Sequence, residues 1–174
     1  LEKTASKSPI SQEATASSSS NFKIELEKFS LDNCKFILPY KNRKLEIKNI
    51  TLETGLKTEG KKTLIPSANL KFNFANTDFK IDVDNVLVES QLTKVKEFNV
   101  SFNKNSLLFF GEYSQNGTGN INLKTIIKEI ESLKPIIQEL EPNLINLLPN
   151  GALDFSLTSQ IDQLLPKNIL ANLK

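Results

Sequence analysis

The chain has 174 residues, a hydrophobic fraction of 39% and a net charge of +2, which fits one domain with enough apolar side chains for a core. The near balance of charge and the single arginine, Arg43, argue against a nucleic-acid partner, because phosphate and base recognition relies on arginine. Histidine is absent and Cys34 is the sole cysteine, which excludes histidine-based triads, His/Cys zinc sites and an intramolecular disulfide.

Residues 1–21 are rich in serine, threonine and alanine, and their only large apolar side chains are Leu1 and Ile10. Such a segment buries too little surface to offset its conformational entropy. We predict a Ser-rich flexible linker over 1–21 and a single β-rich domain over 22–174, which we expect to be a fragment of a longer protein. No stretch approaches the ~18 consecutive apolar residues of a membrane-spanning helix.

An eight-residue pattern, apolar-x-apolar-x-x-apolar-x-apolar, dominates the first part of the domain. Its copies cover 24–31, 45–52, 81–88 and, more weakly, 93–100. Alternation predicts half-buried strands, but the double polar step in the middle would turn the second apolar pair to the wrong face. The four steps are Glu27-Lys28, Lys48-Asn49, Asp84-Asn85 and Lys96-Glu97. A β-bulge at each step restores the face and bends the strand, so the pattern predicts a curved sheet with one apolar face.

About eight strands are predicted between residues 22 and 123, separated by turn residues. The clearest signals are Asp32-Asn33, the polar tip 40–44 after Pro39, the turn 76–78 and Asn116-Gly117. Because the connections are too short to hold helices, the strands are expected to form an antiparallel meander.

From Leu123 onward the apolar residues recur at helical spacing. Amphipathic helices are predicted at about 124–148, divided by Pro135 and Pro142, and at about 161–173, with a strand at 152–157 between them. The predicted fold class is therefore mainly β (α+β). It is a curved, twisted antiparallel sheet with C-terminal amphipathic helices packing on or capping its apolar face.

Two motifs partly match a metal-binding or a phosphate-binding site, but both are better explained as solvent-exposed residues of the sheet and its loops. Asp82 and Asp84 alternate with apolar residues and lack the central glycine of a calcium loop. The segment 55–63 approaches a phosphate-binding loop, but Lys62 stands where Ser or Thr is required and no helix follows. We expect no catalytic residue, no metal and no cofactor, and therefore no enzyme.

The positive signal is apolar surface, with 11 phenylalanines and many Ile and Leu side chains assigned to one side of the sheet. In one interpretation the helices from 124 onward cover this side as an ordinary core. In the other they cover only part of it, and the rest is an apolar trough for acyl chains. Composition alone favours the covered core.

The strand units LEIKNITL (45–52) and IELEKFSLDN (24–33) resemble those of the AsmA-like family, the periplasmic β-groove proteins of the TamB and YhdP type. Segments 119–123 and 151–157 resemble the Gly-x-apolar-x-apolar strand starts of the same family. The resemblance covers about residues 22–160. It implies a groove-shaped sheet that carries or shields lipid in the periplasm, behind an N-terminal inner-membrane anchor that we expect in the longer protein, outside this fragment.

Because of this resemblance, we interpret the apolar side of the sheet as an open groove and not as a covered core. We hypothesise lipid binding or transfer, or outer-membrane assembly, with a lipid or other acyl-chain ligand as partner and no catalysis. The expected lining is Ile24, Leu26, Phe29, Leu31, Leu45, Ile47, Ile50, Leu52, Phe72, Phe74, Ile81, Val83, Val86, Phe98 and Val100. The alternative is a structural or adhesive surface module whose core is fully covered.

Overall fold

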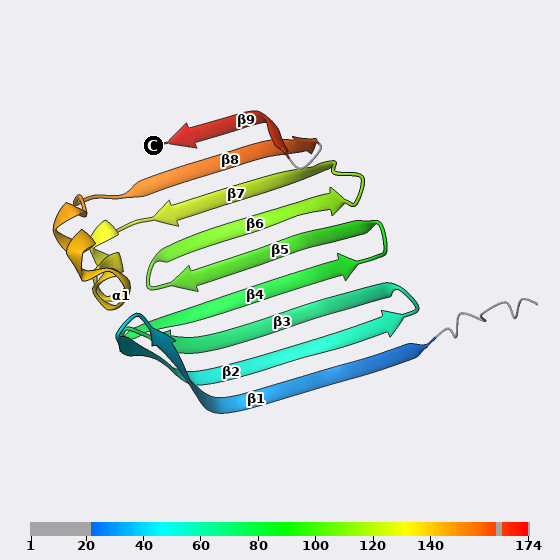
Figure 1. The fold of residues 1–174 in the computed structure, drawn as a ribbon, viewed down its shortest axis with the longest axis horizontal. Helices are drawn as coiled ribbons and strands as arrows, with labels where there is room; N and C mark the ends of the chain where they lie inside the picture. Colours follow the sequence, from blue (N-terminus) through cyan, green and yellow to red (C-terminus); the bar gives the residue numbers. More distant parts are fainter. Residues whose placement is uncertain (1–21, 163–164, 174) are drawn as a thin grey trace, which may run out of the picture.

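The computed structural model describes residues 22–162 and 165–173, and these form one curved, open sheet of nine antiparallel strands (Figure 1). The strands lie side by side in chain order, so every connection joins neighbours in the sheet. The mainly β fold class and the meander are thereby confirmed. The predicted linker, 1–21, lies outside the described residues.

The strands are long at the start of the chain and shorter toward its end. They are β1 (Lys23–Tyr40), β2 (Arg43–Glu59), β3 (Lys62–Phe74), β4 (Thr77–Val88), β5 (Leu92–Phe102), β6 (Asn105–Ser114), β7 (Gly119–Ile127), β8 (Leu153–Asp162) and β9 (Leu165–Leu173). The connection from β7 to β8 contains a 3₁₀-helix η1 (Ile130–Leu133), a helix α1 (Lys134–Leu140) and a second 3₁₀-helix η2 (Pro142–Leu147). We call residues 130–147 the helical segment.

The strands between residues 22 and 123 are longer and fewer than predicted. Six strands and the first part of β7 occupy this described region, because β1 continues through Asp32-Asn33 and β3 continues through Pro66. Asn33 has a φ of 51°, and the register between β1 and β2 shifts between Leu31 and Cys34. The pair therefore forms a bulge within one strand, and not the predicted turn.

Bulges occur at three of the four double polar steps where they were predicted. The register shifts between Leu26 and Phe29 in β1, between Lys48 and Thr51 in β2, and between Val95 and Phe98 in β5. Each interval contains a predicted step, and each shift keeps the next apolar pair on the same face of the sheet.

The step at Asp84-Asn85 behaves differently, although Asn85 has a φ of 49°. The pairing of β4 with β3 and with β5 runs past this point without a register shift. In both neighbouring strands the alternation of apolar side chains also shifts by one residue opposite this step, at Pro66-Ser67 in β3 and at Lys96-Glu97 in β5. Three strands therefore bend together here, which preserves the pairing while curving the sheet.

The helix predicted at about 124–148 begins later than expected, because residues 119–127 form β7. Leu123, Thr125 and Ile127 alternate on one face and pair with β8, so a period of two prevails over the helical spacing. The division by proline is confirmed, since Pro135 and Pro142 lie in the first turns of α1 and η2.

The helix predicted at about 161–173 is wrong. Ile161 and Asp162 end β8, and Leu165–Leu173 forms β9, which pairs antiparallel with β8. Pro166 is tolerated because β9 is the last strand of the described sheet, where a missing N–H faces no further strand. Asn168, with a φ of 51°, lies at a register shift that a helix would not contain.

The sheet has no second layer within the described residues. Leu45 and Ile127, at 6% and 7% exposure, are the only hydrophobic side chains there that are buried. Among the described helices, none has the length and hydrophobicity that crossing a bilayer requires. The packing of the molecule is therefore mainly that of neighbouring side chains on one sheet.

Candidate functional site

Cross-strand pairing places apolar side chains from every strand on one face of the sheet, which we call the apolar face. Residues directly opposite each other in antiparallel strands project on the same face. One series of partners runs Phe29, Thr54, Ala68, Val83, Phe98, Phe109, Leu123, Leu157, Ala171. The next runs Leu31, Leu52, Leu70, Ile81, Val100, Leu107, Thr125, Phe155, Leu173. Both series cross all of the described strands without a charged side chain.

All fifteen residues predicted to line a groove lie on the apolar face. Ile24 and Leu26 belong to this face because they lie opposite Thr58 and Leu56 of β2, and Val86 belongs to it because it lies opposite Val95. Leu45 differs from the rest because it is buried, so the other fourteen are the ones that a ligand can contact. Their role in binding stays a prediction.

The sequence-based list missed other members of the face. These are Phe36, Leu38, Phe79, Phe102, Leu107, Phe109, Leu123, Phe155 and Leu157. Alternation in 107–113 and 153–157 was visible in the sequence, but the side of the sheet that it faces depends on the pairing partner. Phe36 and Leu38 belong to a stretch that the sequence had separated from β1 by a predicted turn.

Three phenylalanines on neighbouring strands form a row of contacting rings, one pair stacked and the other tilted, which we call the ring row. The rings of Phe72 and Phe79 have centroids 4.9 Å apart and planes 7° apart, and Phe79 lies 5.1 Å from Phe102. Each such pair contributes about 0.5–1.5 kcal/mol beyond its buried area. The ring row therefore adds side-chain contacts between β3, β4 and β5 close to the end where the helical segment lies.

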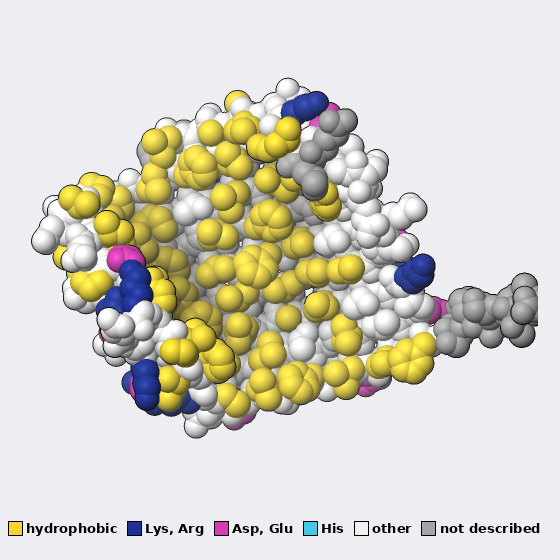
Figure 2. Space-filling view, in the orientation of Figure 1, with side chains coloured by type: hydrophobic (Ala, Val, Ile, Leu, Met, Phe, Trp, Pro, Cys, Tyr) yellow, Lys and Arg dark blue, Asp and Glu magenta, His cyan; other side chains and the backbone are white. Residues whose placement is uncertain are grey.

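The apolar face remains open to solvent. Figure 2 shows hydrophobic side chains spread across it from β1 to β8, with a hollow beside the helical segment. Ile24, Phe29 and Phe36 are 42%, 41% and 52% exposed. Neighbouring strands lie about 4.8 Å apart and each strand residue rises about 3.3 Å, so nine strands of at least nine residues span roughly 38 Å by 30 Å, on the order of 1,000 Å². This area exceeds the few hundred Å² of apolar patch found on most monomeric proteins.

Charged side chains occupy the opposite face, which we call the polar face, and there they pair across strands. Lys57 contacts Glu25 at 2.6 Å, and the hydrogen bond from this lysine lowers the pKa of the Glu25 carboxyl. Asp82 accepts hydrogen bonds from Asn69 at 2.5 Å and pairs with Lys80 at 2.7 Å. These carboxylates are thus paired with neighbouring side chains of the polar face.

No group of three or more His, Cys, Asp or Glu side chains in the described residues has a metal-binding arrangement. A hollow of about 450 Å³ is lined by polar residues, among them Lys71, Asn73, Asp78 and Lys80, and also by the ring-row residues Phe72, Phe79 and Phe102. Asn73 donates to Asp78 there at 2.8 Å. The hollow is open, and its lining combines charged and polar residues with aromatic ones.

The helical segment joins opposite parts of the sheet at one end. It follows β7, yet it contacts the β1–β2 hairpin: the Arg43 Nη2 donates to the Leu140 carbonyl at 2.8 Å, and the Tyr40 hydroxyl donates to Glu141 Oε1 at 3.3 Å. Lys41 forms an ion pair with Glu141, and its hydrogen bond lowers the pKa of that carboxyl. The segment therefore lies across this end of the curved sheet (Figure 1).

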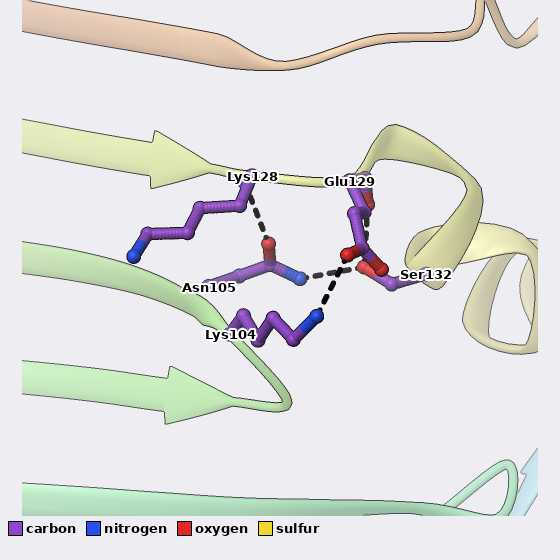
Figure 3. Close-up of polar contacts among 5 residues, drawn as sticks. All are labelled: Lys104, Asn105, Lys128, Glu129 and Ser132. Atoms are coloured by element: carbon purple, nitrogen blue, oxygen red, sulfur yellow. Dashed lines mark hydrogen bonds and ion pairs between the residues drawn. The ribbon is translucent and has the colours of Figure 1, made fainter.

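A second set of contacts holds the start of the helical segment (Figure 3). Asn105, only 2% exposed, donates to Ser132 Oγ at 2.7 Å and accepts from the Lys128 amide at 3.0 Å. Lys104 pairs with Glu129 at 2.9 Å, and this raises the pKa of the lysine. The helical segment is thus fixed to the β5–β6 turn as well as to the first hairpin.

The arrangement offers broad apolar contact, a charged outer surface and one end occupied by the helical segment. Comparison of the chain with protein-family models, with curated proteins and with solved structures found no match. Function is therefore inferred from the geometry of the apolar face and from the resemblance of its strand units.

Proposed function

We propose that the apolar face binds the acyl chains of lipid, and that the protein carries or shields lipid without a bond-making step. The observation that carries this proposal is the pair of uncharged cross-strand series, which cross the nine described strands with no second layer over them. Covering roughly 1,000 Å² of such surface is worth on the order of 25 kcal/mol. Flexible acyl chains can supply that cover without specific polar partners.

We further propose that this takes place in the periplasm, in lipid transfer or outer-membrane assembly, within a protein anchored to the inner membrane. Support comes from the resemblance of residues 22–160 to AsmA-like strand units, together with an apolar face of the kind such a role requires. The bulges support it as well, because they keep successive apolar pairs on one side of a bent strand.

The direct test is native mass spectrometry of the purified protein, followed by lipid extraction and by titration with a fluorescent fatty acid. We expect co-purified lipid and saturable uptake of the probe. A protein that is free of lipid and takes up no fatty acid would refute the proposal.

Two adjacent phenylalanines provide a matched pair of variants. Phe109 lies on the apolar face opposite Phe98, whereas Phe110 lies on the polar face and is 40% exposed. Phe109→Asp places a charge against the ligand and should weaken fatty-acid binding at least about tenfold, a change of about 1.4 kcal/mol. Phe110→Asp should leave binding unchanged, and circular dichroism checks that both variants are folded. Equal losses in the two variants would contradict binding on the apolar face.

The alternative function, a structural or adhesive module, requires a core that is fully covered. Within the described residues only Leu45 and Ile127 are buried hydrophobic side chains. The hairpin tip that such a module would use is engaged by the helical segment through Arg43 and Tyr40. No observation therefore favours this alternative over lipid binding.

A further inference from the structure

The apolar face is not uniform along its strands. At the end away from the helical segment, the series of opposed residues is Ile24, Thr58, Thr63, Val88, Thr93, Tyr113, Gly119, Ile161. Four of these carry hydroxyl groups, and we call Thr58, Thr63, Thr93 and Tyr113 the hydroxyl row. The two series farther along the strands have one threonine each, Thr54 and Thr125. Hydroxyl groups are thus concentrated at one end of the face.

The hydroxyl row remains able to bind a polar ligand group. All four side chains are partly exposed. Within the described part of the chain, the one hydrogen bond inside the row joins the hydroxyls of Thr58 and Thr63, at 3.4 Å. Each hydroxyl has a donor and two acceptor positions, so the row keeps capacity for further hydrogen bonds.

At the helical end, polar groups are already paired within the protein. Asn105 uses both its amide nitrogen and its amide oxygen to hold the helical segment. Arg43 donates to a helix carbonyl, and Lys41 pairs with Glu141. No buried side-chain nitrogen or oxygen in the described residues lacks a hydrogen-bond partner. Between these groups lies the ring row, which presents aromatic surface.

We propose that lipid binds in one orientation, with its acyl chains toward the ring row and its headgroup at the hydroxyl row. This inference rests on the proposed function and adds the direction of the ligand. A phosphate or carboxylate oxygen accepts hydrogen bonds from the hydroxyl row and stays hydrated at the open end. The reverse orientation places that oxygen beside the phenylalanine rings of the ring row, which donate no hydrogen bond, and this costs a desolvated polar group.

The absence of tryptophan makes a single-tryptophan reporter possible. Ile24→Trp and Phe36→Trp lie on the same strand and the same face, at opposite ends, and both positions are exposed enough to accept the larger ring. Each reporter is titrated with stearic acid carrying a nitroxide near its carboxylate or near its terminal methyl. A phosphatidylcholine labelled on its headgroup or at its chain end forms the second arm, and separates a phosphate from a carboxylate source.

We expect labels near the headgroup to quench I24W more than F36W, and labels at the chain end to do the reverse. Either arm giving this pattern supports the orientation and identifies the source of the headgroup. Equal quenching at both positions, or the opposite pattern, overturns the orientation while leaving lipid binding intact. No quenching of either reporter by any labelled lipid overturns both the orientation and the proposed function.

A set of isosteric variants tests the hydroxyl row itself. Thr58→Val, Thr63→Val and Thr93→Val combined should lower the ratio of headgroup to chain-end quenching at I24W at least about threefold, the effect of losing one net hydrogen bond. Thr54→Val with Thr125→Val removes hydroxyls from the two inner series and should leave the ratio unchanged. An unchanged ratio in the triple variant, or an equal fall in the control, overturns the assignment of the headgroup to the hydroxyl row.

Discussion

Replacement of Asn105 by alanine should release the helical segment from the sheet. Asn105 is 2% exposed and is the first residue of β6, and its side chain joins this strand to residues that follow the end of β7. Its amide donates to Ser132 Oγ at 2.7 Å and accepts from the Lys128 N–H at 3.0 Å. Alanine removes both bonds and leaves the Lys128 amide without its partner.

The expected cost follows from these two bonds. Each contributes about 1 kcal/mol net, so their loss lowers the free energy of unfolding, or of local opening, by about 2 kcal/mol. Opening of the helical segment alone becomes about 30-fold more frequent for that change, because 1.36 kcal/mol is a factor of ten. If the whole domain loses this stability, its melting temperature falls by about 4–8 °C.

Hydrogen exchange measured by mass spectrometry separates local opening from global unfolding. We expect faster exchange in peptides covering 130–147 and unchanged protection in β3, β4 and β5. Asn120→Ala is the control, since Asn120 is an exposed strand residue and its replacement should change stability by less than about 0.5 kcal/mol. Unchanged exchange of 130–147 in the Asn105 variant would refute the anchoring role of this side chain.

Two further perturbations test the contacts that shape the molecule. Because the hydrogen bond from Lys41 lowers the pKa of Glu141 below its ordinary value of 4.5, this pair stabilises the folded state above that value and ceases to do so as the pH falls through the lowered pKa. Glu141→Gln should remove this acid-dependent part of the stability in urea titrations at several pH values, and a variant with the same acid profile as the parent would contradict the assignment. Gly111→Ala should destabilise the sheet by about 1–3 kcal/mol in thermal unfolding, because its Cβ meets the Asn120 carbonyl oxygen at 2.5 Å. Gly60→Ala meets no atom within 4 Å and carries only the strain of its φ of +57°, about 1–2 kcal/mol, so a larger cost at position 60 than at 111 would argue against this account of the close approach.

The curvature and the apolar face are local properties of the chain, which is why they were predictable. When a double polar step interrupts an alternating strand, a bulge keeps both apolar pairs on the same side of the sheet. Such bulges are present at Glu27-Lys28, Lys48-Asn49 and Lys96-Glu97. The fifteen predicted residues lie on one face for the same reason. Their identity required only periodicity, and their role as a lipid site remains to be tested.

The last strand was not predictable in this way. Leu165, Ile169 and Leu173 recur every four residues, as in an amphipathic helix, and Pro166 fits either interpretation. This segment forms a strand because it pairs with the free hydrogen-bonding edge of β8, and that edge is available only when the meander is assembled. Secondary structure at an edge is set by the partner strand as much as by the segment.

Whether the apolar face is covered was likewise decided by tertiary structure. Composition favoured a core beneath helices, and the chain from 124 onward has the apolar residues for such helices. In the structure part of that stretch joins the sheet as β7, and the helical turns that remain are drawn to one end by Arg43, Tyr40 and Asn105. Arg43 and Leu140 are 97 positions apart, so no local pattern contains their contact. The sequence by itself determined a bent sheet with one apolar side, and the long-range contacts of the helical segment determined that this side stays open.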